Sequence, residues 1–269
     1  MMPPDLDIRA MTPAELDPAI EWAAEEGWNP GLADAACFRA ADPEGFLMAF
    51  RVGEPIASIS VVRYEAAFAF LGFYIVRPPF RGRGYGLRLW QAGMARASKA
   101  ERSGGVVAQQ ANYARSGFVL AHRNIRFGGD VRVGAPSDAR LAAVDDDRVP
   151  AVLAFVRCWL RPDGRSALAL VENGRVQGYG VIRDARTGRK IGPLFAASEG
   201  DADVLLRALA STAGGGLVFL DVPEPNQSAL GLAARYGLAP AFETARMYRG
   251  AAPALPLDRI YGITSFELG

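Results

Sequence analysis

Residues 71–94 read LGFYIVRPPFRGRGYGLRLWQAGM, and this stretch decides the fold. Leu71–Val76 is an apolar run rich in aromatic and β-branched residues, which predicts a buried strand. Pro78-Pro79 ends that strand, because proline has no N–H to donate to a sheet. Apolar residues then recur at helical spacing, so we expect a helix to begin at about Tyr85.

The segment between the strand and the helix, Arg81–Gly86, contains three glycines and two arginines. Glycine lets the backbone turn tightly and approach a ligand without a Cβ in the way. The first N–H groups of a helix have no partner within it, and the helix dipole favours negative charge at that end. This combination predicts a phosphate or pyrophosphate site. The spacing fits neither a Walker loop nor a dinucleotide fingerprint, since Leu87 stands where the third glycine of the latter should be.

Length and charge limit the possible partners. The chain has 269 residues, which indicates two domains of about equal size. Thirty Lys and Arg against 29 Asp and Glu give a net charge of +1. We therefore expect no nucleic-acid partner and no membrane partner, because no overall field attracts either.

Cys37 and Cys158 match neither a disulfide framework nor a metal spacing, and no apolar segment of signal length opens the chain. The sequence therefore predicts a reduced, cytoplasmic protein. The single histidine, His122, lies in an alternating run and cannot build a metal site or a catalytic triad alone. We expect no metal.

One order of elements occurs twice along the chain. Residues 1–129 predict a strand, two helices, three antiparallel strands, the phosphate loop, a helix, a weak fifth strand at Val106–Val107, a short helical turn and a closing strand at Phe118–Phe127. Residues 130–269 repeat it, with closing strands near Phe242–Tyr248 and Tyr261–Leu268. The predicted organisation is a tandem repeat with its junction near residue 130, where Gly and Pro gather.

The second repeat lacks the phosphate chemistry. Where the first has Arg81–Gly86, the second has Ser198-Glu199-Gly200-Asp201, with one glycine and two carboxylates. Like charges would repel a pyrophosphate there, whereas a carboxylate caps a helix well. We therefore expect one active site, on the N-terminal half.

The loop resembles the Arg/Gln-x-x-Gly-x-Gly/Ala element of the GNAT acyltransferase superfamily, here Arg81, Arg83, Gly84 and Gly86, after a strand that ends in Val-x-Pro. With its tandem order, nearly the whole chain resembles a two-domain GNAT N-acetyltransferase whose second domain has diverged. The resemblance implies an α+β fold in which each repeat has a central, mostly antiparallel mixed sheet flanked by helices.

The resemblance also implies acetyl-CoA as cosubstrate, held between splayed fourth and fifth strands. Its pantetheine arm would pair with backbone at Tyr74–Val76, as an added strand does. A backbone N–H near Tyr74 or Ile75 would hold the developing oxyanion. The implied cofactor-binding residues are Tyr74, Ile75, Val76, Arg81, Gly82, Arg83, Gly84, Tyr85, Gly86 and Leu87.

Tyr113 is the candidate proton donor to the leaving thiolate. It stands four residues before Gly117-Phe118, which is a GNAT spacing, although the asparagine that often precedes it is missing near Val106. A phenol of pKa near 10 protonates a thiolate of pKa near 8.5 only slightly uphill. The alternative is an aromatic ring packed behind the loop.

The remaining candidates are less specific. A general base would come from Glu25, Glu26 or Glu65, and each is equally a surface carboxylate. Arg88 and Arg115 are candidates for a CoA phosphate, or else surface cations. The acceptor, a primary amine of a small molecule or peptide, would bind between the repeats, where ligand sites are common. Candidate lining residues are Trp28, Asn29, Tyr179, Asp221 and Tyr261.

Two other functions stay open at this stage. One is a coenzyme A sensor or interaction module without catalysis, which the weak fifth strand and the missing asparagine favour. The other is a transferase for a different acyl-CoA or for an aminoacyl group, and the lack of a basic patch argues against the aminoacyl version.

Overall fold

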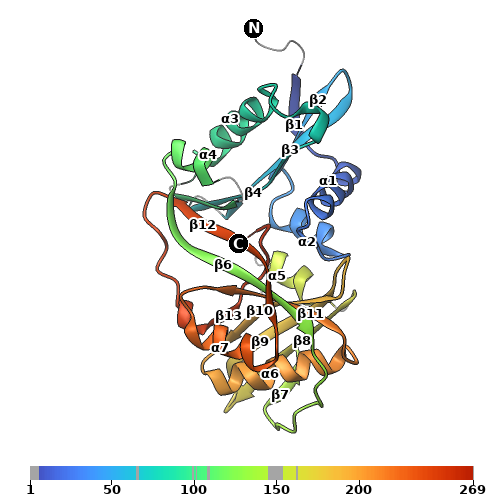
Figure 1. Ribbon diagram of the computed structural model, residues 1–269, viewed down its shortest axis with the longest axis vertical. Helices are drawn as coiled ribbons and strands as arrows, with labels where there is room; N and C mark the ends of the chain where they lie inside the picture. Colours follow the sequence, from blue (N-terminus) through green and yellow to red (C-terminus); the bar gives the residue numbers. More distant parts are fainter. Residues whose placement is uncertain are drawn as a thin grey trace.

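The computed structural model describes residues 6–64, 67–98, 100, 102–107, 110–144, 154–161 and 163–268. Two halves are stacked along the long axis of the molecule (Figure 1). The first half contains β1 (Leu6–Ala10), α1 (Pro13–Glu25), α2 (Asp34–Ala41), β2 (Phe46–Arg51), β3 (Glu54–Tyr64), β4 (Phe68–Val76), the 3-10 turn η1 (Pro78–Phe80), α3 (Tyr85–Ala97), β5 (Arg102–Val107), α4 (Gln110–Arg115) and β6 (Val119–Asp130).

The second half repeats this order in a reduced form. It contains β7 (Leu141–Ala143), α5 (Ala154–Trp159), β8 (Arg165–Glu172), β9 (Arg175–Asp184), β10 (Arg189–Ala196), α6 (Glu199–Thr212), β11 (Leu217–Pro223), α7 (Gln227–Arg235), β12 (Ala239–Arg249), the 3-10 turn η3 (Leu257–Arg259) and β13 (Ile260–Gly262). The repeated order predicts a helix over Val149–Leu160, which falls partly outside the described residues, since these resume at Ala154.

The α+β fold class is confirmed, but the two sheets are joined into one. The strand order is β1-β2-β3-β4-β5-β12-β6-β11-β10-β9-β8-β7, with β13 beside β10. The closing strand of each half therefore pairs with the other half: β6 runs antiparallel to β11, and β12 lies between β5 and β6. Figure 1 shows these two long strands crossing the middle of the molecule. A division of the repeats between residues 129 and 130 stays a prediction.

The expected strand over Tyr261–Leu268 is wrong in extent, because β13 ends at Gly262. The rest of this segment leaves the sheet and lies between the halves. Within this segment, Ser265 Oγ accepts a hydrogen bond of 3.1 Å from the Leu268 N–H, which closes a turn. The Tyr64 hydroxyl donates to the Leu268 carbonyl at 3.1 Å.

Helices cover the two faces of the first sheet. On one face, α3 and Tyr113 of α4 pack on Leu71 and Ala69. On the other, α1 and α2 pack on Phe73 and Ile75, in a core that also includes Trp159 of α5. That second core connects the two halves. None of the helices among the described residues has both the length and the apolar run needed to cross a bilayer.

A buried carboxylate on α2 links the halves electrostatically. Asp34 is fully buried and accepts hydrogen bonds from Arg165 at 3.1 Å, from Arg183 at 3.3 Å and from the Gly31 N–H at 3.0 Å. Burial alone would raise the pKa of Asp34, but Arg183, Lys190 and Arg165 outweigh burial, so the pKa lies below its ordinary value. The carboxylate is therefore ionised and neutralises second-half cations.

Cys37 and Cys158 form a disulfide that joins α2 to α5, and their Cα atoms are 5.2 Å apart. The expectation that the cysteines are unpaired is therefore wrong. A sequence separation of 121 residues gives no local signal, and the tertiary packing of α2 against α5 brings the two together. The reduced protein was predicted because the two cysteines match no disulfide framework, and this disulfide contradicts that reason.

Reduction of this disulfide is expected to lower the free energy of unfolding by about 2–4 kcal/mol, because it releases a long loop in the unfolded chain. Urea unfolding of the wild-type protein with and without a thiol reductant measures the difference. A Cys37→Ser/Cys158→Ser variant is the control, and its midpoint should not respond to reductant. Equal wild-type midpoints under both conditions would refute a stabilising bridge.

Candidate active site

The loop after β4 adopts the backbone conformation that its glycines allow. Gly82 has φ of 73° and Gly84 has φ of 80°, and a Cβ on either would meet no atom within 4 Å. Glycine is thus required there by the left-handed backbone, and the space above the loop is open. Backbone whose φ alternates in sign turns successive N–H groups into one concavity, which suits an anion.

The loop leads directly into α3, whose N-terminus is available to a ligand. Gly84 is the N-cap, and no described side chain caps this helix end. The first helical hydrogen bond runs from the Arg88 N–H to the Gly84 carbonyl. The amides of Arg83–Leu87 precede that bond and lack a partner within the helix, so they can donate to an anion.

Gly86 serves a different purpose, which is close packing of α3 on β4. A Cβ at this position would lie 2.8 Å from Tyr74 Oη and 3.0 Å from Val76 Cγ2. A side chain here would push the helix off the strand. The glycine therefore fixes the distance between the loop amides and the end of β4.

Arg81 and Glu26 form an ion pair at the surface of the protein. The Arg81 Nε–H donates to the Val76 carbonyl at 2.7 Å, and a second guanidinium nitrogen donates to Glu26. Arg81 thus holds the loop against the end of β4, and Glu26 is engaged in an ion pair at the surface. Glu25 is exposed, and Glu65 lies outside the described residues.

The strands β4 and β5 separate beside the loop, and we call this point of separation the fork. They pair in parallel from Phe68 to Leu71 on β4, against Arg102 to Gly105 on β5, and no further. The β3–β4 register shifts at the same level, and Phe73 has φ of 48°. The Ser58 hydroxyl donates to the Phe73 carbonyl at 2.9 Å, which fixes this bulge. Beyond it, residues 73–76 present a backbone edge that β5 does not occupy.

Tyr113 lies in the core behind this fork. It is 1% exposed, and its ring centroid lies 4.4 Å from that of Trp90 and 5.1 Å from that of Phe118. A Cβ on Gly105 would be 2.8 Å from its Cε1, so the ring reaches the β5 side of the fork. Burial raises the pKa of Tyr113 above its ordinary value, and Tyr74 adds to the shift.

The residues expected to line an acceptor pocket do not form one group. Asn29 exchanges two hydrogen bonds with the Thr187 backbone. Trp28 packs against Phe73, and their ring centroids lie 6.1 Å apart. Asp221 is buried in an ion pair with Arg126 at 2.6 Å. The other two lie in the second half, where Tyr179 packs edge-on against Phe195 and Tyr261 belongs to the core.

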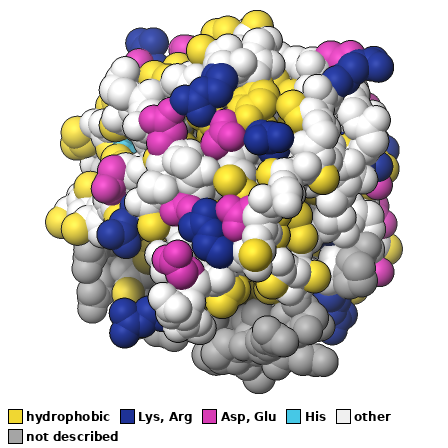
Figure 2. Space-filling model, turned by 90° about the horizontal axis from the view of Figure 1, so that it is seen from below, with side chains coloured by type: hydrophobic (Ala, Val, Ile, Leu, Met, Phe, Trp, Pro, Cys, Tyr) yellow, Lys and Arg dark blue, Asp and Glu magenta, His cyan; other side chains and the backbone are white. Residues whose placement is uncertain are grey.

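In the second half, the segment that corresponds to the phosphate loop is a capped helix start. Ser198 caps α6 by accepting from the Asp201 N–H at 3.2 Å, and Asp201 pairs with Arg140 at 2.8 Å. The start of α6, where the first half has its phosphate loop, therefore carries carboxylates that are engaged within the second half. The face of the second half in Figure 2 carries cationic and anionic side chains interspersed with one another.

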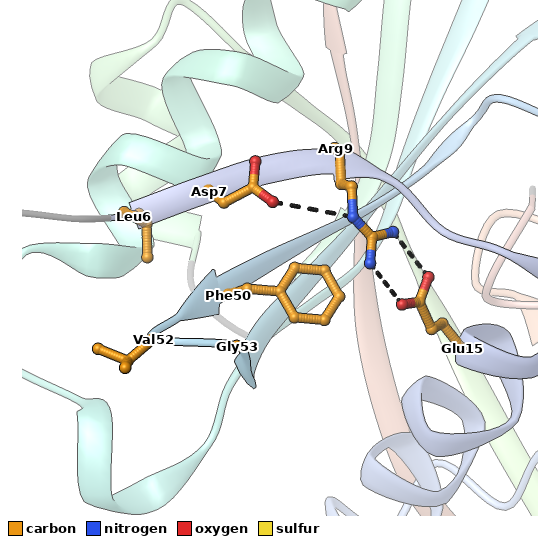
Figure 3. Close-up of a pocket in the computed structure, with 7 residues that line it drawn as sticks. All are labelled: Leu6, Asp7, Arg9, Glu15, Phe50, Val52 and Gly53. Atoms are coloured by element: carbon orange, nitrogen blue, oxygen red, sulfur yellow. Dashed lines mark hydrogen bonds and ion pairs between the residues drawn. The ribbon is translucent and has the colours of Figure 1, made fainter.

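Among the described residues, two of the cavities lie away from the loop. One, of about 700 Å³, lies at the outer end of the sheet beside β1 and the β2–β3 hairpin. Figure 3 shows its charged residues paired with each other: Arg9 donates to both Glu15 oxygens, and its guanidinium lies 4.2 Å from the Phe50 ring centroid. These contacts lower the pKa of Glu15 to about 2. The Arg9–Glu15 pair also joins β1 to α1, so the charged residues of this pocket serve the fold.

The other cavity, of about 450 Å³, is mainly apolar and lies on the face of β4 opposite α3. Its lining residues are Tyr64, Ala67, Phe68, Phe155, Arg246, Tyr248, Pro253, Leu255 and Leu268. The Arg246 guanidinium lies 4.9 Å from the Phe70 ring centroid and is buried, which lowers its pKa. This cavity was not found from the sequence, because residues from both halves line it.

Comparisons with known proteins agree with this geometry. Residues 13–118 match the GNAT acetyltransferase family, and residues 144–262 match a second GNAT acetyltransferase domain. The chain is 33% identical over 263 residues to a holothin acyltransferase from Pseudoalteromonas sp. (strain SANK 73390), covering 93% of this chain and 90% of the relative.

Solved structures share the fold over nearly the whole chain. An acetyltransferase structure from Pyrococcus horikoshii superposes with a TM-score of 0.82 at 21% identity, covering 100% of this chain and 98% of the other. A tandem GNAT protein from the clavulanic acid biosynthesis pathway superposes with a TM-score of 0.64 at 15% identity, covering 93% and 100%.

Proposed function

Because the chain belongs to the GNAT acyltransferase family and carries two such domains in tandem, we propose that it transfers an acetyl group from acetyl-CoA to a primary amine. The observation that carries this proposal is the loop and the fork together. Gly82 and Gly84 open a left-handed loop at the start of α3, directly beside an edge of β4 that β5 does not pair with among the described residues.

In this proposal the amides of Arg83–Leu87 bind the pyrophosphate, with Arg83 as a nearby cation. The backbone of Tyr74, Ile75 and Val76 pairs with the pantetheine arm, as an added strand would. Arg81 positions the loop through the Val76 carbonyl rather than by direct contact. Acetyl-CoA supplies a carbonyl group activated as a thioester.

The acceptor amine reaches that carbonyl from the opposite face of β4. The apolar cavity, which lies beside Phe68 on the face of β4 opposite α3, supports this side. We propose a small-molecule acceptor with an apolar body, since the lining is largely aromatic and aliphatic. A backbone N–H beside the Phe73 bulge holds the oxyanion that forms during attack.

A second candidate, transfer of a longer acyl group, is favoured by the same cavity and by the name of the holothin acyltransferase. Release of free thiol from acetyl-, butyryl- and octanoyl-CoA, in the presence of a panel of small amines and peptides, separates the two. We expect acetyl-CoA to be used fastest. Binding of coenzyme A without turnover of any donor would leave a sensor or interaction module.

Tyr113→Phe is expected to lower kcat about tenfold without changing the affinity for acetyl-CoA. A thiolate of pKa near 8.5 leaves readily, so the proton donor contributes less here than for a poorer leaving group. Phenylalanine keeps the ring contacts with Trp90 and Phe118, and thermal unfolding controls for them. An unchanged kcat would assign Tyr113 to packing alone.

A further inference from the structure

The C-terminal segment places a carboxylate without a partner between the two halves. Glu267 is 1% exposed, and neither of its carboxylate oxygens has a hydrogen-bond partner among the described residues. A buried charge without hydrogen bonds is costly, and native structures avoid it unless a ligand or ion uses the group. This carboxylate is therefore a candidate ligand-binding group.

The segment brings the backbone of Glu267 to the fork of the first half. A Cβ on Gly72 would lie 2.4 Å from the Glu267 carbonyl oxygen, so the two backbones are in direct contact. Gly72 precedes Phe73, whose φ of 48° marks the bulge where β4 leaves β5. Since the backbone of Glu267 touches this point, its carboxylate lies within one side-chain length of the fork.

Other buried polar groups with unused hydrogen-bonding capacity lie on β3, β6, β10 and β12. They are Ser60 Oγ, both polar atoms of the Asn124 side chain, Lys190 Nζ and Thr244 Oγ1. Asn124 and Thr244 are directly paired across β6 and β12, and Ser60 is paired with Gly72 across β3 and β4. This part of the interface between the halves thus carries polar groups with unused hydrogen-bonding capacity, in addition to the apolar core that includes Trp159.

The charged groups around Glu267 are nearly balanced. Arg126 and Lys190 interact with it electrostatically, while Asp221 pairs with Arg126 at 2.6 Å and lies 4.0 Å from Lys190. Arg183 also acts on Lys190 and Asp221. No described residue forms a hydrogen bond to the Glu267 carboxylate, so its oxygens stay available to accept from a donor.

We propose that Glu267 binds the amino group of the acceptor and takes the proton that its nitrogen loses on acylation. This inference rests on the proposed function. The N–H groups of a primary amine donate to the free carboxylate oxygens. As the N–C bond forms and the C–S bond breaks, one N–H proton passes to Glu267 and later to water. The thiolate takes its own proton from Tyr113, and the tyrosinate then regains a proton from water.

Glu267→Gln is the direct test, because it keeps the size of the side chain and removes its basicity. We expect kcat/KM for the amine to fall about 100-fold at pH 7, with the acetyl-CoA affinity within twofold of wild type by calorimetry. The loss should shrink as the pH rises, since hydroxide and neutral amine replace the base. Glu243→Gln, an exposed carboxylate on β12, is the matched control and should keep wild-type kinetics.

Glu267→Ala provides a second readout that a structural role would not give. Added formate should restore part of its turnover, in proportion to formate concentration, whereas it should not affect Glu243→Gln. Wild-type kcat/KM in Glu267→Gln, or loss of turnover in Glu267→Ala without rescue, would overturn the assignment. If wild-type protein acetylates no amine at all, it is the proposed function that fails instead.

Discussion

Gly84→Val is expected to weaken the binding of acetyl-CoA about 100-fold. Valine is β-branched and does not tolerate the φ of 80° that Gly84 adopts, so the loop must rearrange. The amides that we assign to the pyrophosphate then no longer converge. Loss of two charge-assisted hydrogen bonds at about 1.5 kcal/mol each accounts for this factor.

The matched control for Gly84→Val is Gly174→Val. Gly174 lies in the β8–β9 turn with φ of 72°, and a Cβ there would also meet no atom within 4 Å. The two variants therefore impose similar backbone strain, but only one lies at the proposed site. Calorimetric titration should give wild-type affinity for Gly174→Val. Equal losses in both variants would attribute the effect to general destabilisation.

Asp34→Asn is expected to lower the free energy of unfolding by about 3–5 kcal/mol, because it leaves Arg165 and Arg183 buried without a counter-charge. Asparagine keeps the volume, so the loss reports the charge. Chemical denaturation measures the change. Glu21→Gln removes an exposed partner of Arg186 and serves as the control, for which we expect a change below about 1 kcal/mol.

A small effect of Asp34→Asn would contradict the view that this carboxylate connects the halves. The variant also tests whether the two halves unfold together. Because Arg165 and Arg183 belong to β8 and β9, loss of Asp34 weakens an interface rather than one core. We expect one cooperative transition in both proteins, at a lower denaturant concentration in the variant.

The sequence predicts those parts of the structure that depend on local signals. The strand that ends at Val76, the turn at the double proline and the helix from Tyr85 follow from periodicity and from glycine and proline positions, and all three are found. The carboxylates around Ser198 correctly indicate a capped helix in the second half.

The sequence could not predict contacts between distant segments. The alternation in residues 118–127 indicates a strand, but it does not say that this strand pairs with β11 of the other half. The disulfide has the same cause, since packing of α2 on α5 brings Cys37 to Cys158. Glu267 offered one weak signal, a carboxylate within the apolar run Phe266–Leu268, and its burial depends on both halves.

The candidate site also combines residues that the sequence predicts with residues that it does not. The loop residues could be chosen because glycine positions and helix starts leave a pattern in the sequence. Acceptor residues leave none, and Asn29 and Asp221 turn out to be engaged in contacts that hold the structure together. The apolar cavity near Arg246 could be found only from the fold.

The central claim is that one coenzyme A site exists per chain, at the loop Arg81–Gly86. Calorimetric titration of acetyl-CoA into the wild-type protein measures the number of sites directly. We predict one site, with its affinity lost in Gly84→Val and kept in Gly200→Ala at the corresponding turn of the second half. Absence of heat, two sites, or a site that survives in Gly84→Val with unchanged affinity would contradict this account.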